Sequence, residues 1–193
     1  DSPYQPFSSF AGNPLLIDLD ELVENGYITK QMCEEADYGA DPSYVDYEKV
    51  TATKLSILRE AFRSFTDDVG YTSFVMEEKD WLDDYALFTA LKDRFGGKPW
   101  TQWDEDIKLR MPDAMYRYKE ELKEDIRFVK FVQYIFYRQW DRFHRYCNKN
   151  GIQIIGDIPI YVSPDCSDVW AQPELFELDE RRNPARVAGV PPD

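Results

Sequence analysis

The feature that most constrains the fold is a change of periodicity near residue 150. Over residues 116–148, apolar side chains recur every three or four positions, a spacing that predicts one long helix. The next stretch, GIQIIGD at 151–157, is rich in β-branched side chains, as in a buried parallel strand. Pro159 and Pro164 disfavour further central pairing, so Asp157 is expected near the carboxyl end of that strand.

A single parallel strand implies further strands beside it, and this sequence does not contain them. A parallel strand pairs at its edges and is covered on both faces, and no second clear run of this kind occurs in the 193 residues. The pattern therefore predicts the α/β fold class, in a mostly helical segment of a longer protein. The ends agree with a fragment, because the chain opens with Asp1 rather than Met and stops at Asp193 after two prolines.

Other elements follow from local signals. Two further amphipathic helices are predicted, at 45–65 and 80–97, the second with Asp80 as its cap. Residues 1–16 place Pro, Gly, Ser and Asn between aromatic side chains, which predicts an irregular surface loop. Further caps are expected at Asp18 or Asp20, at Thr29 and at Asp165.

An excess of acidic side chains narrows the classes of partner. Lys and Arg number 23 against 37 Asp and Glu, a formal charge of −14, so nucleic acid and anionic membrane surfaces would be repelled. Aromatic residues make up 16% of the chain. Rings that stack on pyranose faces, beside carboxylates that accept from hydroxyls, suit a neutral sugar. The same composition also fits an aromatic core under a solubilising acidic surface.

Cysteine usage indicates a reducing compartment. Cys33, Cys147 and Cys166 are far apart, odd in number and outside CxxC spacing, so neither a disulfide framework nor a zinc site is predicted. No apolar run reaches membrane-spanning length, and the start lacks a secretory signal pattern. We expect a cytoplasmic protein that uses no metal or cofactor.

Few side chains are candidates for chemistry. The one histidine, His144, lies on the long helix without partners for a triad or an HExxH site, so a structural role is expected. Cys166 has no basic neighbour to lower the pKa of its thiol and is not expected to be a nucleophile. It is interpreted as structural, together with Asp165 and Asp168.

Asp157 is the exception among the carboxylates. A carboxylate at the carboxyl end of a barrel strand points into the region where such folds keep their active sites. The alternative interpretation is a turn or capping aspartate before Pro159.

Six strings, in order along the chain, carry a family resemblance. They are DSPYQPFSSFAGNPLLIDLDEL, WLDDYALFTALKDRFGGKPW, QYIFYRQW, GIQIIGDIPIYV, DVWAQPELFELD and VAGVPPD. Together they resemble the bacterial and plastid 4-α-glucanotransferases of glycoside hydrolase family 77, from one end of the chain to the other. Each string is ordinary alone, but six in order make a specific signal.

The resemblance implies part of a (β/α)8 TIM barrel with inserted helical subdomains. Its expected segments are a substrate loop at 1–16, a helical insertion at 17–115, a barrel helix plus strand at 116–163 and a loop or subdomain at 164–193. The family is retaining, with an aspartate nucleophile and a glutamate acid/base on later strands. No catalytic residue is therefore expected in this segment, and the isolated chain is predicted to be inactive.

Four residues match sugar-binding positions of the family. Ser2 and Tyr4 match residues that contact the donor sugar beside the scissile bond, Tyr4 as an aromatic wall. Asp157 matches an aspartate that hydrogen-bonds the same sugar, and Asp193 matches the start of a mobile loop that covers the site. The structural alternatives are aromatic packing for Tyr4, a turn for Ser2 and a disordered end for Asp193.

One stretch departs from the family pattern. Where the family reads close to AEDSADVWAHPE, this chain reads SPDCSDVWAQPE, with Pro164, Cys166 and Gln172 among the replacements. The loop after the strand is therefore expected to differ in shape, and no sugar contact is assigned to it.

The expected reaction moves α-1,4-glucan segments from maltooligosaccharide or amylose donors to glucose or oligosaccharide acceptors. Two rivals remain: a non-catalytic glucan-binding or interaction module that keeps Tyr4 and Asp157, and a purely structural acidic helical protein. In the isolated chain, the unpaired strand predicts self-association, strand swapping or partial disorder around 151–162.

Overall fold

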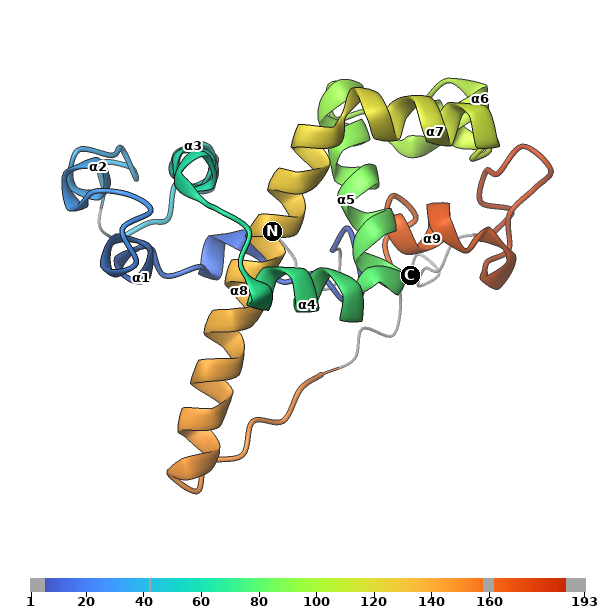
Figure 1. The fold of residues 1–193 in the computed structure, drawn as a ribbon. Coiled ribbons are helices and arrows are strands. Elements are labelled where there is room, and N and C mark those ends of the chain that lie inside the picture. Colours follow the sequence, from blue (N-terminus) through green and yellow to red (C-terminus); the bar gives the residue numbers. More distant parts are fainter. Residues whose placement is uncertain (1–5, 42, 158–161, 187–193) are drawn as a thin grey trace. The chain divides into compact units, whose positions relative to one another are not determined.

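Helices make up nearly all of the regular structure. A computed structural model describes residues 6–41, 43–157 and 162–186, which Figure 1 draws in colour. The chain forms two units. Unit 1 comprises residues 1–11, 78–129 and 155–193, and unit 2 comprises residues 12–77 and 130–154.

Unit 1 is organised around α5 (Lys79–Arg94), which lies against α9 (Ser167–Ala171). Its core is aromatic: the Phe88 ring lies 5.3 Å from the Trp103 ring and 6.0 Å from the Trp170 ring, centroid to centroid. All three side chains are buried, so the described residues of unit 1 form an apolar core from helices and turns. The remaining elements are η2 (Trp100–Gln102), α6 (Glu105–Lys108), α7 (Pro112–Glu121), the first turns of α8 (Lys123–Lys149) and η3 (Pro173–Leu175).

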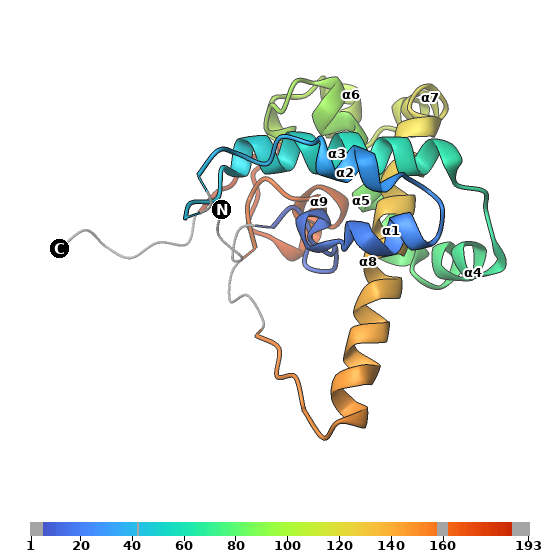
Figure 2. The same cartoon turned by 90° about the vertical axis from the view of Figure 1, so that its left-hand side faces the viewer.

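Unit 2 packs short helices and one long helix against the rest of α8. Its centre is Phe131 on α8, whose ring lies 4.8 Å from Phe65 and 5.5 Å from Phe62 at the end of α3 (Tyr47–Ser64). Tyr71 and Tyr134 meet edge to face beside them. The other elements are η1 (Pro14–Leu16), α1 (Leu19–Glu24), α2 (Lys30–Glu34) and α4 (Val69–Glu77), and Figure 2 shows α1 and α2 near α3.

Residues 12–18 lie along α8 and are held by side-chain amides. Gln133, which is 1% exposed, accepts from the Gly12 N–H at 2.8 Å and donates to the Gly12 carbonyl at 3.0 Å. Gln139 makes the same reciprocal pair with Asp18, at 2.8 and 3.0 Å. Between them, Lys54 Nζ donates to the carbonyls of two residues of this segment. Side chains thus satisfy a backbone that has no strand partner.

Several predicted helix ends are confirmed. The helix expected at 45–65 is α3, and Thr29 caps α2 by accepting from the Met32 N–H. Asp18, rather than Asp20, caps α1. The cap expected at Asp80 is wrong, because α5 already begins at Lys79 and no side chain caps it.

The helix expected over 116–148 is interrupted. Its first part belongs to α7, which ends at Glu121, and α8 starts at Lys123. Leu122 between them has φ −104° and ψ 18°, outside the helical basin, and its side chain is buried in the core of unit 1. Apolar periodicity continues through the break because both helices pack on the same core.

The predicted strand is wrong, and with it the expected fold class, α/β with a partial (β/α)8 barrel. Residues 152–157 run from the end of α8 as an irregular, exposed stretch (Figures 1 and 2), and no strand occurs in the described residues. The one bridge found there joins Leu178 to Pro184. The β-branched residues of this run favour a strand conformation, but a strand forms only when a neighbouring strand accepts and donates its hydrogen bonds. None of the described residues provides such a neighbour.

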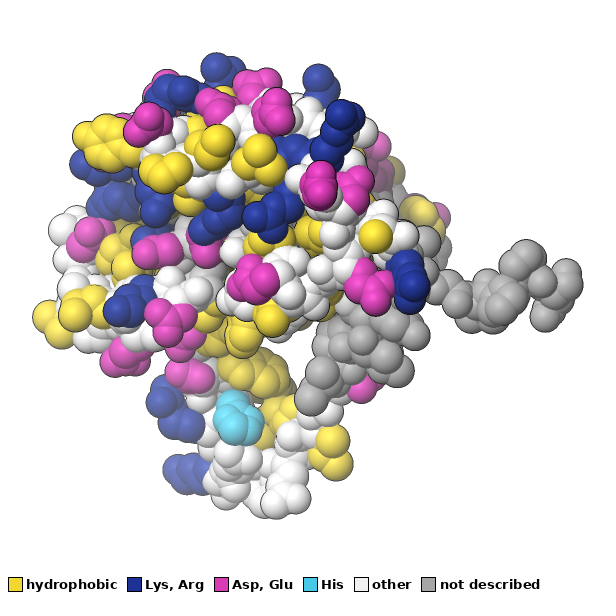
Figure 3. Space-filling view, turned by 90° about the vertical axis from the view of Figure 1, so that its right-hand side faces the viewer, with side chains coloured by type: hydrophobic (Ala, Val, Ile, Leu, Met, Phe, Trp, Pro, Cys, Tyr) yellow, Lys and Arg dark blue, Asp and Glu magenta, His cyan; other side chains and the backbone are white. Residues whose placement is uncertain are grey.

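Charged side chains of both signs occur on the surface. On the face shown in Figure 3, Lys and Arg side chains are interspersed with Asp and Glu despite the formal charge of −14. No helix within the described ranges is long and apolar enough to cross a lipid bilayer.

Candidate functional site

The four predicted sugar contacts fall at the edges of what the structure describes. Ser2, Tyr4 and Asp193 lie outside the described residues. Asp157 is exposed, at the end of the irregular stretch that follows α8. Their roles stay predictions, and the described geometry concerns the segments that flank them.

Two segments distant in sequence are tied together in unit 1. Residues 6–11 follow the position of Tyr4, and residues 163–171 come after Asp157; we call them the tied segments. The Ser167 backbone N–H and its hydroxyl donate to the Phe7 carbonyl, at 2.8 and 2.9 Å. The Ser9 N–H and hydroxyl donate to Asp168 Oδ2, at 2.8 and 3.1 Å. Four directional bonds thus fix one segment against the other.

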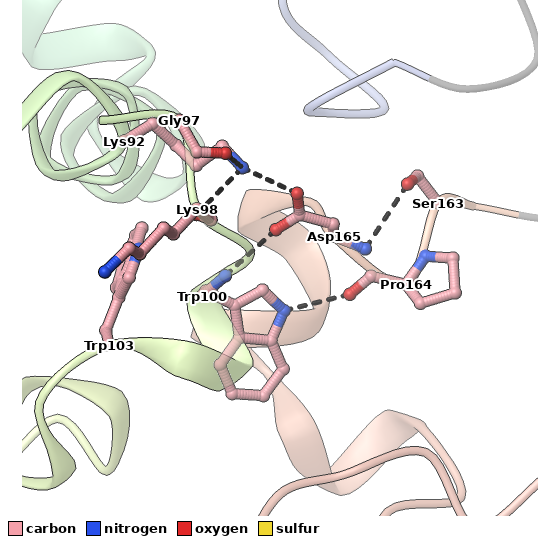
Figure 4. A network of polar contacts seen from close by, with 8 residues as sticks. All are labelled: Lys92, Gly97, Lys98, Trp100, Trp103, Ser163, Pro164 and Asp165. Atoms are coloured by element: carbon pink, nitrogen blue, oxygen red, sulfur yellow. Dashed lines mark hydrogen bonds and ion pairs between the residues drawn. The ribbon is translucent and has the colours of Figure 1, made fainter. Parts of the chain in front are cut away.

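Lys92, in the last turn of α5, points toward Asp165 of the second tied segment (Figure 4). Its side chain is buried, and Nζ donates to Asp165 Oδ2 at 2.6 Å and to the carbonyls of Gly97 and Lys98 at 3.0 and 3.1 Å. The same ammonium lies 5.3 Å from the centroid of the Phe7 ring. One buried cation therefore contacts both tied segments.

Gly97 can present its carbonyl to Lys92 because the chain turns sharply after α5. Gly96 and Gly97 have φ of +64° and +78°, values that side chains with a Cβ rarely adopt. The Gly97 N–H returns to the Lys92 carbonyl at 2.7 Å. The glycine pair predicted from sequence as a helix stop thus also supplies a ligand for the ammonium.

Asp165 joins α5 to the turn at η2. Its Oδ1 accepts from the Trp100 N–H at 3.1 Å, and the Trp100 indole N–H donates to the Pro164 carbonyl at 2.9 Å (Figure 4). The expectation that Asp165 caps the following turn is wrong: Cys166 is the N-cap residue of α9, and no side chain bonds there. Asp165 is structural, as interpreted from sequence, but through long-range partners.

Cys166 is completely buried in the core of unit 1. Burial raises the pKa of its thiol to about 11, with smaller contributions from neighbouring carboxylates that its hydrogen bonds partly offset. A thiolate is therefore scarce near neutral pH, which agrees with the sequence interpretation that this residue is not a nucleophile.

His144 lies on the exposed part of α8 (the cyan side chain in Figure 3). Its ring stacks on Trp140 with centroids 6.1 Å apart, and Asn148 Nδ2 is 3.4 Å from Nε2. These neighbours form no acid–base pair. Within the described ranges, no group of three His, Cys, Asp or Glu side chains is placed to hold a metal ion.

Sequence reasoning missed Lys92, Ser9 and Ser167. Their partners are 73, 159 and 160 positions away, so no local pattern reports the contacts. The available signal was a lysine on the last turn of an amphipathic helix just before a glycine pair, which is typical of a residue that binds terminal carbonyls.

Comparisons with known proteins agree on one family. The family model described as 4-alpha-glucanotransferase, glycoside hydrolase family 77, matches residues 1–193. The 4-alpha-glucanotransferase of Clostridium butyricum is 47% identical over 196 residues, which cover 100% of this chain and 40% of that protein. The Thermus thermophilus enzyme of the same name is 45% identical over 199 residues, covering 100% of this chain and 39% of that protein.

A solved structure is also similar to this chain. The amylomaltase of Streptococcus agalactiae, determined in complex with acarbose, superimposes with a TM-score of 0.95 at 42% identity. The match covers 100% of this chain and 40% of that one. The chain thus spans about 40% of the length of the relatives and of the solved structure that it matches.

Proposed function

Because this chain belongs to the 4-alpha-glucanotransferase family, we propose that it forms part of the donor-sugar site of an enzyme that transfers α-1,4-glucan segments. The observation that carries the proposal is the joining of residues 6–11 to residues 163–171 by Ser9, Ser167 and their partners. These tied segments give fixed anchor points to the stretches that carry Tyr4 and Asp157.

Each of the four proposed residues makes a different kind of contact with the sugar. The Tyr4 ring forms an aromatic wall against the sugar, and Ser2 adds a polar contact. Asp157, which is exposed, accepts hydrogen bonds from sugar hydroxyls. Asp193 begins a loop that covers the bound glucan and helps to exclude water.

Bond-making groups are assigned to other parts of the complete protein. In a retaining transfer, a carboxylate nucleophile forms a glycosyl-enzyme, and an acid/base protonates the leaving sugar and then activates the incoming hydroxyl. The proposed donors are maltooligosaccharides and amylose, and the proposed acceptors are glucose or oligosaccharides. Residues 1–193 alone are expected to turn over no substrate.

We further propose a cytoplasmic location. The three cysteines are free, two of them buried, as suits a reducing compartment.

The test is maltotriose disproportionation by the complete gene product and its variants. For Asp157→Asn we expect kcat/KM to fall about 10- to 100-fold, since a hydrogen bond between a charged group and the sugar is lost. For Tyr4→Ala we expect the KM for the donor to rise about tenfold, through lost ring contact. The matched control is Asp113→Asn, an exposed carboxylate of unit 1 on α7, which should leave both constants unchanged.

Two results would contradict the proposal. If the complete protein binds maltotriose but converts none, it is a glucan-binding module. If Asp157→Asn and Tyr4→Ala both behave like the control, the donor sugar does not contact this part of the chain.

A further inference from the structure

We propose that the buried Lys92–Asp165 ion pair is a positioning device for the donor sugar, acting through the tied segments and setting the KM for the glucan. This inference rests on the proposed function and deepens it. Neither residue is placed in contact with the sugar, so both are positioning residues rather than catalytic ones.

The first argument is that Lys92 has its donors satisfied in fixed directions. An ammonium has three donors, and Lys92 Nζ has three acceptors: the carbonyls of Gly97 and Lys98 and the Asp165 carboxylate. The residue is 8% exposed, so water does not compete freely for these bonds. Its position is therefore fixed relative to α5 and the turn that follows.

The second argument is that this fixed cation lies at the junction of the tied segments. It is bonded to Asp165 in the segment that follows Asp157 and lies 5.3 Å from the Phe7 ring in the segment that follows Tyr4. Phe7 in turn accepts two bonds from Ser167, two residues beyond Asp165. A displacement of Asp165 would therefore be transmitted to both segments.

The third argument concerns energy. A buried ion pair contributes little net stability compared with a well-packed apolar pair, because desolvation offsets most of the attraction. Its contribution is instead to fix the relative positions of the two side chains, through short charge-assisted bonds such as the 2.6 Å contact between Lys92 and Asp165. A stability role and a positioning role therefore make different predictions for a neutral replacement.

The decisive variant is Lys92→Met with Asp165→Asn, made in the complete protein. It removes both charges together, so no buried charge is left unpaired, and the amide oxygen can still accept from the Trp100 N–H. We expect the KM for a maltooligosaccharide donor, at saturating glucose, to rise about tenfold while kcat changes less than about threefold. A role in stability alone would lower the active fraction, and hence kcat, without moving the KM.

The control is the same pair of substitutions at another ion pair of unit 1, Arg117→Met with Asp106→Asn. That pair joins α7 to α6 at 2.8 Å and contacts neither tied segment. Its KM should match that of the unaltered protein. A shift there as large as at Lys92 and Asp165 would overturn the proposal, because it would show a general effect of charge removal.

A second variant tests whether the effect passes through the bonds between the tied segments. It can be measured even if the first variant fails to fold. Asp168→Ala removes the acceptor of both Ser9 bonds and leaves the Lys92–Asp165 pair intact. It should raise the donor KM in the same direction, and its effect should be less than additive with the neutral pair. An unchanged KM in either the neutral pair or Asp168→Ala overturns the inference. An unaltered protein that converts no glucan overturns the proposed function instead, and the inference with it.

Discussion

The Cys166 thiol couples the stability of unit 1 to pH. Burial raises its pKa in the folded chain from 9.0 to about 11. Between these values the unfolded chain has released a proton that the folded chain keeps, so stability present below pH 9 is lost as the pH rises toward 11. We expect the unaltered chain to lose on the order of 2 kcal/mol more than Cys166→Ala between pH 8.5 and 11, measured by urea unfolding.

The comparison with Cys166→Ala cancels the titration of lysines and tyrosines, which both proteins share. Alkylation gives an independent check at pH 8: Cys33, which is partly exposed, should react with iodoacetamide before the two buried thiols. Equal slopes of stability against pH in the two proteins would show that the Cys166 thiolate is tolerated in the core.

At residue scale, chemical type was predictable but partners were not. The sequence shows that Cys166 lacks a basic neighbour and that Asp165 sits before a turn. It does not show that Asp165 bonds Lys92 and Trp100, which lie 73 and 65 positions away, because such contacts arise only when helices pack.

At the scale of elements, the approach of residues 12–18 to α8 depends on the absence of one side chain. A Cβ built at Gly12 would lie 1.9 Å from Phe136 Cδ1, and Gly12 cannot withdraw without breaking both of its bonds to Gln133. We therefore expect Gly12→Ala to lower the free energy of unfolding by about 1–3 kcal/mol. Urea unfolding of the 193-residue chain measures it.

Gly156→Ala is the matched control, because a Cβ there meets nothing within 4 Å. It should change stability by less than about 0.5 kcal/mol. Combining Gly12→Ala with Phe136→Leu should recover part of the loss. No recovery, or an equal loss at both glycines, would show that the Phe136 contact does not determine the effect.

Elements were predicted well where their determinants are local. Helix α3 and the caps Thr29 and Asp18 depend on residues within a few positions, and they were confirmed. The strand at 151–157 depends on partners that the described residues do not supply, and that prediction was wrong. The break at Leu122 was missed because buried side chains on both sides keep the apolar spacing regular.

At the scale of the whole molecule, the exposed isoleucines of the stretch after α8 predict self-association of the isolated chain. Ile152 and Ile154 are 54% and 37% exposed, and Ile155 is 94% exposed. Burying such side chains between two copies removes apolar surface from water, which favours association. Sedimentation of residues 1–193 should show concentration-dependent association, weakened about tenfold in Ile155→Lys.

The control for charge alone is Met76→Lys, at an apolar side chain of α4 that is 68% exposed. It should associate as the unaltered chain does. A chain that sediments as a monomer at every concentration, or that associates less in both variants alike, would contradict a role for the isoleucines.

Family membership was the part of the whole-molecule picture that sequence predicted best. Six ordered strings indicated the same family whose model matches residues 1–193. The candidate site was predicted only in its contact residues, and of these the structure describes Asp157 alone. The tied segments next to those residues were not foreseen, because a loop's anchor points depend on the fold beneath it.

Two glutamine side chains of α8 fix residues 12–18 to this helix at two separate points. Gln133 and Gln139 are six residues apart, which places them about 9 Å apart along the axis and about 120° apart around it. Their partners, Gly12 and Asp18, are also six residues apart, so the segment winds partly around the helix as it runs along it. Two anchors at different heights and angles therefore restrain residues 12–18 both from rotating about α8 and from sliding along it, which a single anchor would not do.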